Sequence, residues 1–278
     1  MVNRNIGFIG AGNMGKALIN GLICSKISSK ELIICSDPYE DKLNSLKNEF
    51  GVMISVNNAN VLNTADIIIL AVKPPIIPAV CEEIKNCARI EEKLFISVAA
   101  GIPSNAIESC IGSNAKIVRV MPNVAVSVME GMSVIAKGKN ATGDDVETAK
   151  KIFNSVGKSL EIDESLMDSV TGLSGSGPGY IFLIIEALID AGVRVGLPRE
   201  ISLKLAVQTI LGSVKLISET GEHPSKLKDS VTSPGGTTIA GIHAMETGAL
   251  RATLINAVEA STNRSREIKE QYLKMFFS

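Results

Sequence analysis

The stretch IGFIGAGNMG, residues 6–15, decides the fold of this chain. Its first four residues read as a short buried strand, and the glycines at positions 10, 12 and 15 then form the pattern G-x-G-x-x-G. A helix-like segment from Lys16 to Cys24 follows. Such glycines permit a tight turn and let the N–H groups of a helix start approach a pyrophosphate. In this strand-turn-helix context the stretch predicts dinucleotide binding rather than a merely tight turn.

The same alternation of apolar runs and helix-like stretches continues over residues 1–162. It is typical of a parallel sheet covered by helices. The predicted strands are Ile6–Ile9, Leu32–Cys35, Ile67–Val72, Leu94–Val98, Ile117–Met121 and Met132–Ala136. A further helix is predicted at Ile76–Asn86, and another begins at the capping chemistry of Thr142–Asp145 and ends at Gly157.

Beyond Asp163 the strand signal disappears. The predicted helices are Tyr180–Val195, Pro198–Thr220, Thr238–Glu246 and Ala249–Phe276. We therefore expect an α/β fold, with an N-terminal Rossmann-type parallel-sheet domain at residues 1–162 and an all-helical domain at residues 163–278. The stretch Tyr180–Ala191 is apolar almost all round, so it should be buried within its domain or against another subunit.

Composition excludes several kinds of protein. Lys and Arg total 28 against 29 Asp and Glu, which gives none of the basic field that nucleic-acid binding requires. Residues 1–5 lack a signal-peptide layout, and no apolar run approaches the roughly 20 residues of a membrane helix. We therefore expect no nucleic-acid partner, no membrane insertion and a cytoplasmic location.

Cysteine usage and hydropathy add two further expectations. The five cysteines lie in the first half of the chain and never form C-x-x-C, and there are only two histidines. We expect reduced packing cysteines and no metal site. A mean hydropathy of +0.25 with 45% apolar residues is high for a soluble chain. It favours a large apolar interface and an obligate oligomer.

The end of the second predicted strand bears on the choice of cofactor. Asp37 stands about where an acid reads the ribose in NAD enzymes, but Pro38 follows it, so Asp37 could equally be a turn or cap residue. Ser36 could hydrogen-bond a 2′-phosphate. No arginine lies nearby, which leaves Lys42 and the pair Asn57-Asn58 as helpers. NADPH is modestly favoured, and NADH remains possible.

Three predicted strand ends carry a more particular pattern. They read Ala71-Val72-Lys73-Pro74, Ser97-Val98-Ala99-Ala100-Gly101 and Arg119-Val120-Met121-Pro122-Asn123. All lie at carboxyl ends, where an open parallel sheet binds its ligand. In their residues and in their order along the chain, these segments resemble pyrroline-5-carboxylate reductase.

The helical half resembles the same family more sharply. Residues 173–180, LSGSGPGY, are similar to its L-S-G-S-G-P-A-Y, with Gly179 in place of alanine. The stretch from His223 to Glu246, with TSPGGTT at residues 232–238, matches the family's signature, and Ile255–Ala260 ends a resemblance that covers essentially the whole chain.

The resemblance implies NADPH-dependent hydride transfer to the imine carbon of 1-pyrroline-5-carboxylate, which yields L-proline and completes its biosynthesis. It also implies that the helical domain intertwines with a partner in a homodimer, and that dimers often assemble further. The cofactor-binding residues it implies are Ile9, Gly10, Ala11, Gly12, Asn13, Met14, Gly15, Ser36, Asn58, Ala71, Val72, Lys73, Pro74, Ala100, Met121, Pro122 and Asn123. The expected substrate-binding residues are Ser233, Gly235, Gly236, Thr237, Thr238 and Glu164.

The loop before the helix at Thr238 makes chemical sense as an anion cradle. Small residues let N–H groups converge, and a helix start adds positive potential, so a carboxylate would sit well there. The resemblance places Thr238, the expected catalytic residue, on the ring nitrogen. Because a cyclic imine can carry its own proton, Thr238 needs only to orient it. His223 and His243 are expected to cap or pack, and Lys73 to line the cofactor site.

Two other kinds of protein remain as alternatives. Ketone-reducing enzymes of the β-hydroxyacid dehydrogenase kind use a lysine on an interdomain helix, but here that region offers Glu186 and Asp190 and no lysine before Lys204. A nucleotide-sensing scaffold would keep the loop and lose catalysis, which the intact Thr238 argues against. A six-membered ring imine also remains open as the substrate.

Overall fold

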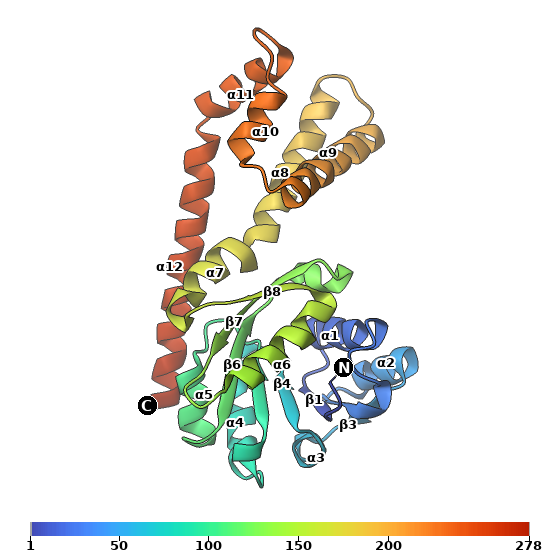
Figure 1. Cartoon of the computed structure of the whole chain (residues 1–278), viewed down its shortest axis with the longest axis vertical. Coiled ribbons are helices and arrows are strands. Elements are labelled where there is room, and N and C mark those ends of the chain that lie inside the picture. Colours follow the sequence, from blue (N-terminus) through green and yellow to red (C-terminus); the bar gives the residue numbers. More distant parts are fainter. Residues whose placement is uncertain (1, 278) are drawn as a thin grey trace. The chain divides into compact units, whose positions relative to one another are not determined.

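The computed structural model describes residues 2–277, without the side chain of Phe277, so Met1 and Ser278 lie outside the described residues. The chain divides into two compact units (Figure 1). The first comprises Met1–Ser176 with Glu259–Ser278, and the second comprises Gly177–Val258. The predicted domain boundary between residues 162 and 163 marks the change from strands to helices. The two compact units are defined differently, by the contacts within each, so the predicted boundary stays a prediction.

An eight-stranded sheet within the described residues forms the centre of the first unit, in the order β3-β2-β1-β4-β5-β6-β7-β8. The strands are β1 (Ile6–Ile9), β2 (Ile33–Ser36), β3 (Met53–Ser55), β4 (Ile67–Leu70), β5 (Leu94–Ser97), β6 (Lys116–Met121), β7 (Gly131–Lys137) and β8 (Gly157–Glu161). Neighbours from β3 to β6 are parallel. The predicted Rossmann-type sheet followed by helices is confirmed.

Successive side chains of a strand point to opposite faces of the sheet, and in the central strands both sets are apolar. Helices therefore cover both faces of the sheet. On one face Ile6 and Phe8 of β1 pack with α1 (Asn13–Cys24), α2 (Glu40–Phe50) and α6 (Gly143–Phe153). The other face packs against helices far apart in the chain. They are α3 (Asn58–Thr64), α4 (Ile77–Lys85), α5 (Ser104–Ile111) and the end of α12 (Leu250–Phe277). Central strands are therefore buried on both sides, which explains their continuous apolar sequences.

The last two strands depart from the parallel pattern. β7 is antiparallel to β6, and β8 is parallel to β7. The connection between β6 and β7, residues 122–130, holds only a short 3-10 helix, Val124–Val128. A parallel neighbour needs a longer crossover, usually an α-helix, so this connection can only return the chain antiparallel.

The predicted cap of α6 is confirmed, and its predicted end is not. Thr142 and Asp145 form a reciprocal capping box at the helix start. The helix ends at Phe153, earlier than the predicted Gly157, which instead begins β8 with a φ of 145°. That backbone conformation favours glycine, so the residue marks the entry to a strand rather than the end of the helix.

The second unit is helical throughout. It contains α8 (Gly177–Arg194), α9 (Arg199–Thr220), α10 (Pro224–Ser230), α11 (Thr237–Thr247) and the first part of α12. Helices α8 and α9 pack against each other (Figure 1). No described residue of α8 is buried, and Phe182 and Leu183 are 62% and 66% exposed. The chain alone therefore does not bury the apolar stretch that the sequence singles out.

Two segments are long and apolar enough to cross a membrane by length and composition alone. They are Glu164–Arg194 and Arg199–Thr220. The expectation that no apolar run approaches this length was therefore wrong. It considered only uninterrupted apolar runs, whereas these segments are apolar on average and contain a few polar residues. One or two such helices are weak support for a membrane span, since helices that pack against other protein pass the same test.

Candidate functional site

The glycine-rich turn after β1 has the geometry of a phosphate cradle. Gly10 has a φ of 109°, and a Cβ there would lie 2.7 Å from the carbonyl oxygen of Ala71. A Cβ on Gly15 would lie 2.5 Å from the carbonyl oxygen of Gly10. By contrast, a Cβ on Gly12 would meet nothing within 4 Å. Two glycines thus close the turn, and the third leaves open space at the start of α1, where a pyrophosphate fits.

A pocket of about 550 Å³ lies beside this turn at the end of β2. It brings together five of the predicted cofactor-binding residues, namely Ile9, Gly10, Ser36, Asn58 and Val72. The other residues that line it are Asp37, Pro38, Val56, Asn57, Ile76, Ala79, Val80 and Glu83. Its place at the carboxyl ends of β1, β2 and β4 is where a Rossmann fold takes the adenosine half of a dinucleotide. The residues present therefore fit NAD(P).

Asp37 is held by the protein itself. Its carboxylate accepts hydrogen bonds from the N–H of Ala11 at 2.9 Å and from the N–H of Tyr39 at 3.0 Å. The ammonium of Lys42 lies 3.7 Å away, and Asp37 is 7% exposed. Both carboxylate oxygens therefore have partners before any cofactor binds. The alternative that Asp37 is a turn residue gains physical support from these bonds.

The remaining predicted cofactor residues follow the ends of neighbouring strands. Ala11–Gly15 form the turn and the start of α1, Ala71–Pro74 follow β4, Ala100 follows β5, and Met121–Asn123 end or follow β6. The side chain of Asn123 is already engaged, since its Oδ1 accepts from the N–H groups of Ala125 and Met132. These cofactor roles stay predictions.

Glu83 was not foreseen in this pocket. It lies on α4 and accepts a hydrogen bond from Asn58 at 2.9 Å. Ile76, Ala79, Val80 and Glu83 have the spacing i, i+3, i+4, i+7 of one helical face, and all line the pocket. That spacing is visible in the sequence. Only the structure, in which α4 packs beside α3, shows that Glu83 on this face lies near the end of β2.

In the second unit, the predicted anion cradle forms the entry to α11. Gly235 has a φ of 66°, and a Cβ on Gly236 would lie 2.3 Å from Ser233 Oγ. Gly236 is the N-cap residue and provides no side-chain cap. The first N–H groups of α11 therefore lack an intrahelical acceptor, next to the exposed Thr237 and Thr238. The structure gathers these predicted substrate-binding residues around one helix start, and their roles stay predictions.

The Glu164 carboxylate makes three contacts, with two residues of the first unit. Its carboxylate accepts from the N–H of Ser104 at 2.8 Å and from Ser104 Oγ at 2.5 Å. It also forms an ion pair of 3.1 Å with Arg119, whose side chain is only 3% exposed. These contacts tie the start of α5 to the centre of the sheet. Glu164 therefore has a clear structural role, and its predicted substrate contact stays a prediction.

Replacing Glu164 with alanine should destabilise the protein strongly. The change leaves the buried Arg119 without its carboxylate, and loss of one member of a buried pair costs about 3–5 kcal/mol. We expect a value near the lower end, because the Glu164 side chain is 25% exposed. Urea unfolding at fixed protein concentration measures the change. The control is Glu161→Ala, which removes an exposed ion pair with Lys150 and should cost less than about 1 kcal/mol. Equal losses would contradict the proposed role.

The histidines and cysteines occupy positions without evident chemistry. His223 caps α10 by accepting from the N–H of Ser225 at 3.3 Å, as predicted. His243 lies inside α11. All five cysteines are free, and burial raises the pKa of Cys35 to about 12. Across residues 2–277 no group of three His, Cys, Asp or Glu side chains is placed to hold a metal ion.

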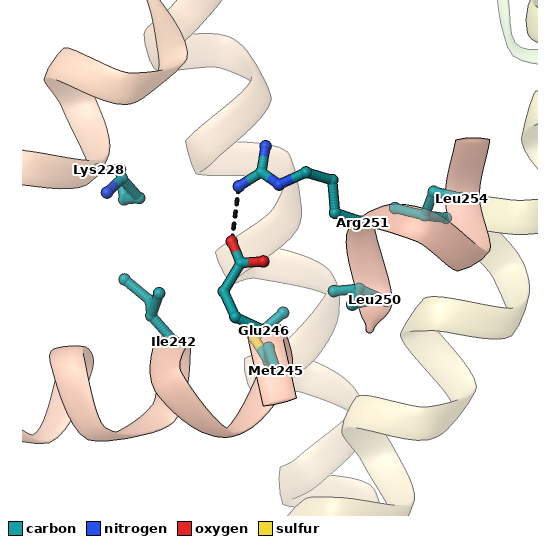
Figure 2. Close-up of a pocket in the computed structure, with 7 residues that line it drawn as sticks. All are labelled: Lys228, Ile242, Met245, Glu246, Leu250, Arg251 and Leu254. Atoms are coloured by element: carbon teal, nitrogen blue, oxygen red, sulfur yellow. Dashed lines mark hydrogen bonds and ion pairs between the residues drawn. The ribbon is translucent and has the colours of Figure 1, made fainter. Parts of the chain in front are cut away.

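A second cavity, of about 270 Å³, lies in the helical unit (Figure 2). Its lining is mainly apolar, from Ile242, Met245, Leu250 and Leu254. Glu246 and Arg251 also line it and form an ion pair of 2.6 Å, and hydrogen bonding to Arg251 lowers the pKa of Glu246. None of the predicted site residues lines this cavity. It is therefore separate from the candidate site.

Comparison with known proteins identifies the family. Residues 164–268 match the family model for pyrroline-5-carboxylate reductase dimerisation, and residues 5–101 match that for NADP oxidoreductase, coenzyme F420-dependent. A pyrroline-5-carboxylate reductase of Methanosarcina acetivorans is 49% identical over 96% of this chain and 99% of its own.

Solved structures agree with the sequence relatives. A pyrroline-5-carboxylate reductase from Coxiella burnetii superposes with a TM-score of 0.90 at 37% identity, over 95% of this chain and 98% of its own. The Plasmodium falciparum pyrroline carboxylate reductase with NADP bound gives a TM-score of 0.86 at 38% identity, over 97% and 99% of the two chains. Sequence and fold thus agree over nearly the full length, and the chain belongs to the pyrroline-5-carboxylate reductase family.

Proposed function

We propose that this protein reduces 1-pyrroline-5-carboxylate to L-proline with NADPH, the last step of proline biosynthesis. The observation that carries the proposal is the 49% identity to a pyrroline-5-carboxylate reductase over nearly the whole of both chains. Two features support it: the first unit has a pocket beside the glycine-rich turn, and the second has an open helix start suited to a carboxylate. We also propose a cytoplasmic location for this activity.

The chemistry asks for little acid–base assistance from the protein. NADPH, when bound, supplies the hydride that adds to the carbon of the substrate C=N bond. An iminium already carries the proton that the product amine keeps, so no strong side-chain acid is required. The chain must hold the substrate and exclude competing poses. In this proposal Ser233, Gly235 and Gly236 help to hold the carboxylate, and Thr238 hydrogen-bonds the ring nitrogen.

A steady-state assay tests the function directly. Oxidation of NADPH with 1-pyrroline-5-carboxylate should be fast, and the six-membered ring homologue should react more slowly. A faster reaction with the larger ring would identify a related imine reductase. No reaction with either ring, together with intact cofactor binding, would favour the nucleotide-sensing alternative.

NADPH should be used in preference to NADH. Asp37 already accepts from two backbone N–H groups, which fix its carboxylate and use about half of its roughly four acceptor sites, so it is less available to a ribose 2′-hydroxyl. Asn58 lines the same pocket, and its amide keeps a second N–H that can donate to the 2′-phosphate. The ratio of kcat/KM for the two cofactors measures the preference. A tenfold or greater preference for NADH would show that Asp37 reads the ribose despite its bonds.

The protein should be a homodimer, or an assembly of dimers, at working concentration. The apolar α8 has no buried residue in the described chain and lies within the region that matches the dimerisation model. Water contact over such a surface is unfavourable. Light scattering should therefore give a multiple of 29.4 kDa at micromolar protein. Phe182→Asp should disrupt the assembly, whereas Leu160→Asp, on an exposed edge strand, should not. A wild-type monomer would contradict this prediction.

A further inference from the structure

The nucleotide pocket contains a carboxylate whose charge has no cationic partner. Glu83 is exposed on α4 and lines the pocket together with Ser36 and Asn58. Within the described residues Glu83 forms no ion pair, whereas Asp37, the other pocket acid, has Lys42 at 3.7 Å and two backbone donors. Glu83 therefore adds to this pocket a negative charge that no ion pair offsets.

Glu83 also sets the direction of a hydrogen-bond chain. It accepts from Asn58 Nδ2 at 2.9 Å, and Asn58 Oδ1 accepts from Ser36 Oγ at 2.6 Å. An ionised carboxylate can only accept, so the amide of Asn58 must turn its NH₂ toward Glu83 and its oxygen toward Ser36. Ser36 thereby donates its single hydroxyl proton to Asn58. What Ser36 can still offer to a ligand is a lone pair.

The hydrogen-bond chain and the charge of Glu83 both favour NADH over NADPH. The 2′-hydroxyl of NADH can donate to the lone pair of Ser36, and it carries no charge. The 2′-phosphate of NADPH is anionic and mainly accepts hydrogen bonds, so it needs donors and is repelled by a carboxylate. Binding NADPH through Ser36 requires the serine proton to leave Asn58.

We propose that Glu83 determines cofactor specificity, and that it limits the preference for NADPH by orienting Asn58 and Ser36 and by its own charge. Glu83 is a positioning residue in this scheme, because it acts on the cofactor through Asn58 and Ser36 and through its charge. The inference rests on the proposed use of nicotinamide cofactors and adds the residue that tunes the choice between them.

The test compares the affinities of NADPH and NADH for wild type and Glu83→Gln by cofactor fluorescence, without substrate. Glutamine removes the charge and can donate as well as accept, which frees the amide of Asn58 to turn. The ratio of affinities, NADPH over NADH, should rise about three- to tenfold, the size expected of an exposed like-charge interaction with a phosphate. The rise should shrink in high salt, which screens exposed charges.

The control is Glu82→Gln on the same helix, since Glu82 is exposed and does not line the pocket. Its ratio should equal that of wild type, and Glu83→Asp, which keeps the charge but shortens the reach to Asn58, should raise the ratio less than Glu83→Gln does. A merely structural role of Glu83 would weaken both cofactors equally and leave the ratio unchanged, which would overturn the proposal. Failure of the wild type to reduce 1-pyrroline-5-carboxylate would overturn the proposed function alone, because these binding measurements need no substrate.

Discussion

Thr238→Ala is expected to lower kcat/KM about ten- to a few hundredfold and to leave NADPH affinity almost unchanged. The hydroxyl is proposed to bond the substrate nitrogen, and a hydrogen bond to a charged group contributes roughly 1.5–3 kcal/mol. Each ~1.4 kcal/mol corresponds to about tenfold in rate. Thr238 lies at the open start of α11, where it is exposed and stabilises no core. Fold stability should therefore be preserved. Steady-state kinetics and cofactor titration measure the two effects.

Two further variants make this prediction specific. Thr238→Ser should recover much of the activity, because it keeps the hydroxyl. Thr247→Ala removes a hydroxyl at the far end of α11 that bonds back to the carbonyl of His243 at 2.9 Å, so it should leave kinetics unchanged. A loss confined to KM would assign Thr238 to binding, and a loss in kcat would place it in the transition state. Wild-type kcat/KM in the alanine variant would remove Thr238 from the mechanism.

The fold was predictable where the sequence pattern matches burial. β1, β4 and β5 are buried at every position, so their apolar sequences stand out. β3 and β8 were not predicted, and both are edge strands with mostly exposed or half-buried residues. An edge strand pairs on one side and needs no continuous apolar run. Its existence follows from the neighbour that it pairs with rather than from its own residues.

Some residues of the candidate site were likewise predictable from the sequence, and others were not. Gly10, Gly12 and Gly15 were predictable, because a local turn imposes their spacing. The environment of Asp37 was not, since its role depends on which backbone N–H groups come within reach. Glu164 was predicted beside the substrate, yet its observed partners, Ser104 and Arg119, come from distant parts of the chain. Polar partners brought together by tertiary packing leave little local signal in a single sequence.

Gly12→Ala should weaken NADPH binding about 10- to 100-fold without lowering the melting temperature. A Cβ at this position meets no protein atom within 4 Å, and the backbone there is extended, with φ −77° and ψ −176°. The same Cβ would occupy the space through which a pyrophosphate approaches the N–H groups of α1. Displacing the anion would weaken one or two charge-assisted hydrogen bonds, each contributing roughly 1.5–3 kcal/mol. Cofactor titration and thermal unfolding measure the two expectations.

Gly15→Ala is the contrasting variant because its steric conflict lies within the protein. Its Cβ would approach the carbonyl oxygen of Gly10 to 2.5 Å, so the turn must shift even when no ligand is present. This variant should lose both stability and affinity, whereas Gly12→Ala should lose affinity alone. If Gly12→Ala bound NADPH as wild type does, the open space beside Gly12 would not be the path of the pyrophosphate. The dinucleotide would then have to approach the turn from another side, and the roles predicted for Asn13 and Met14 would fall with it.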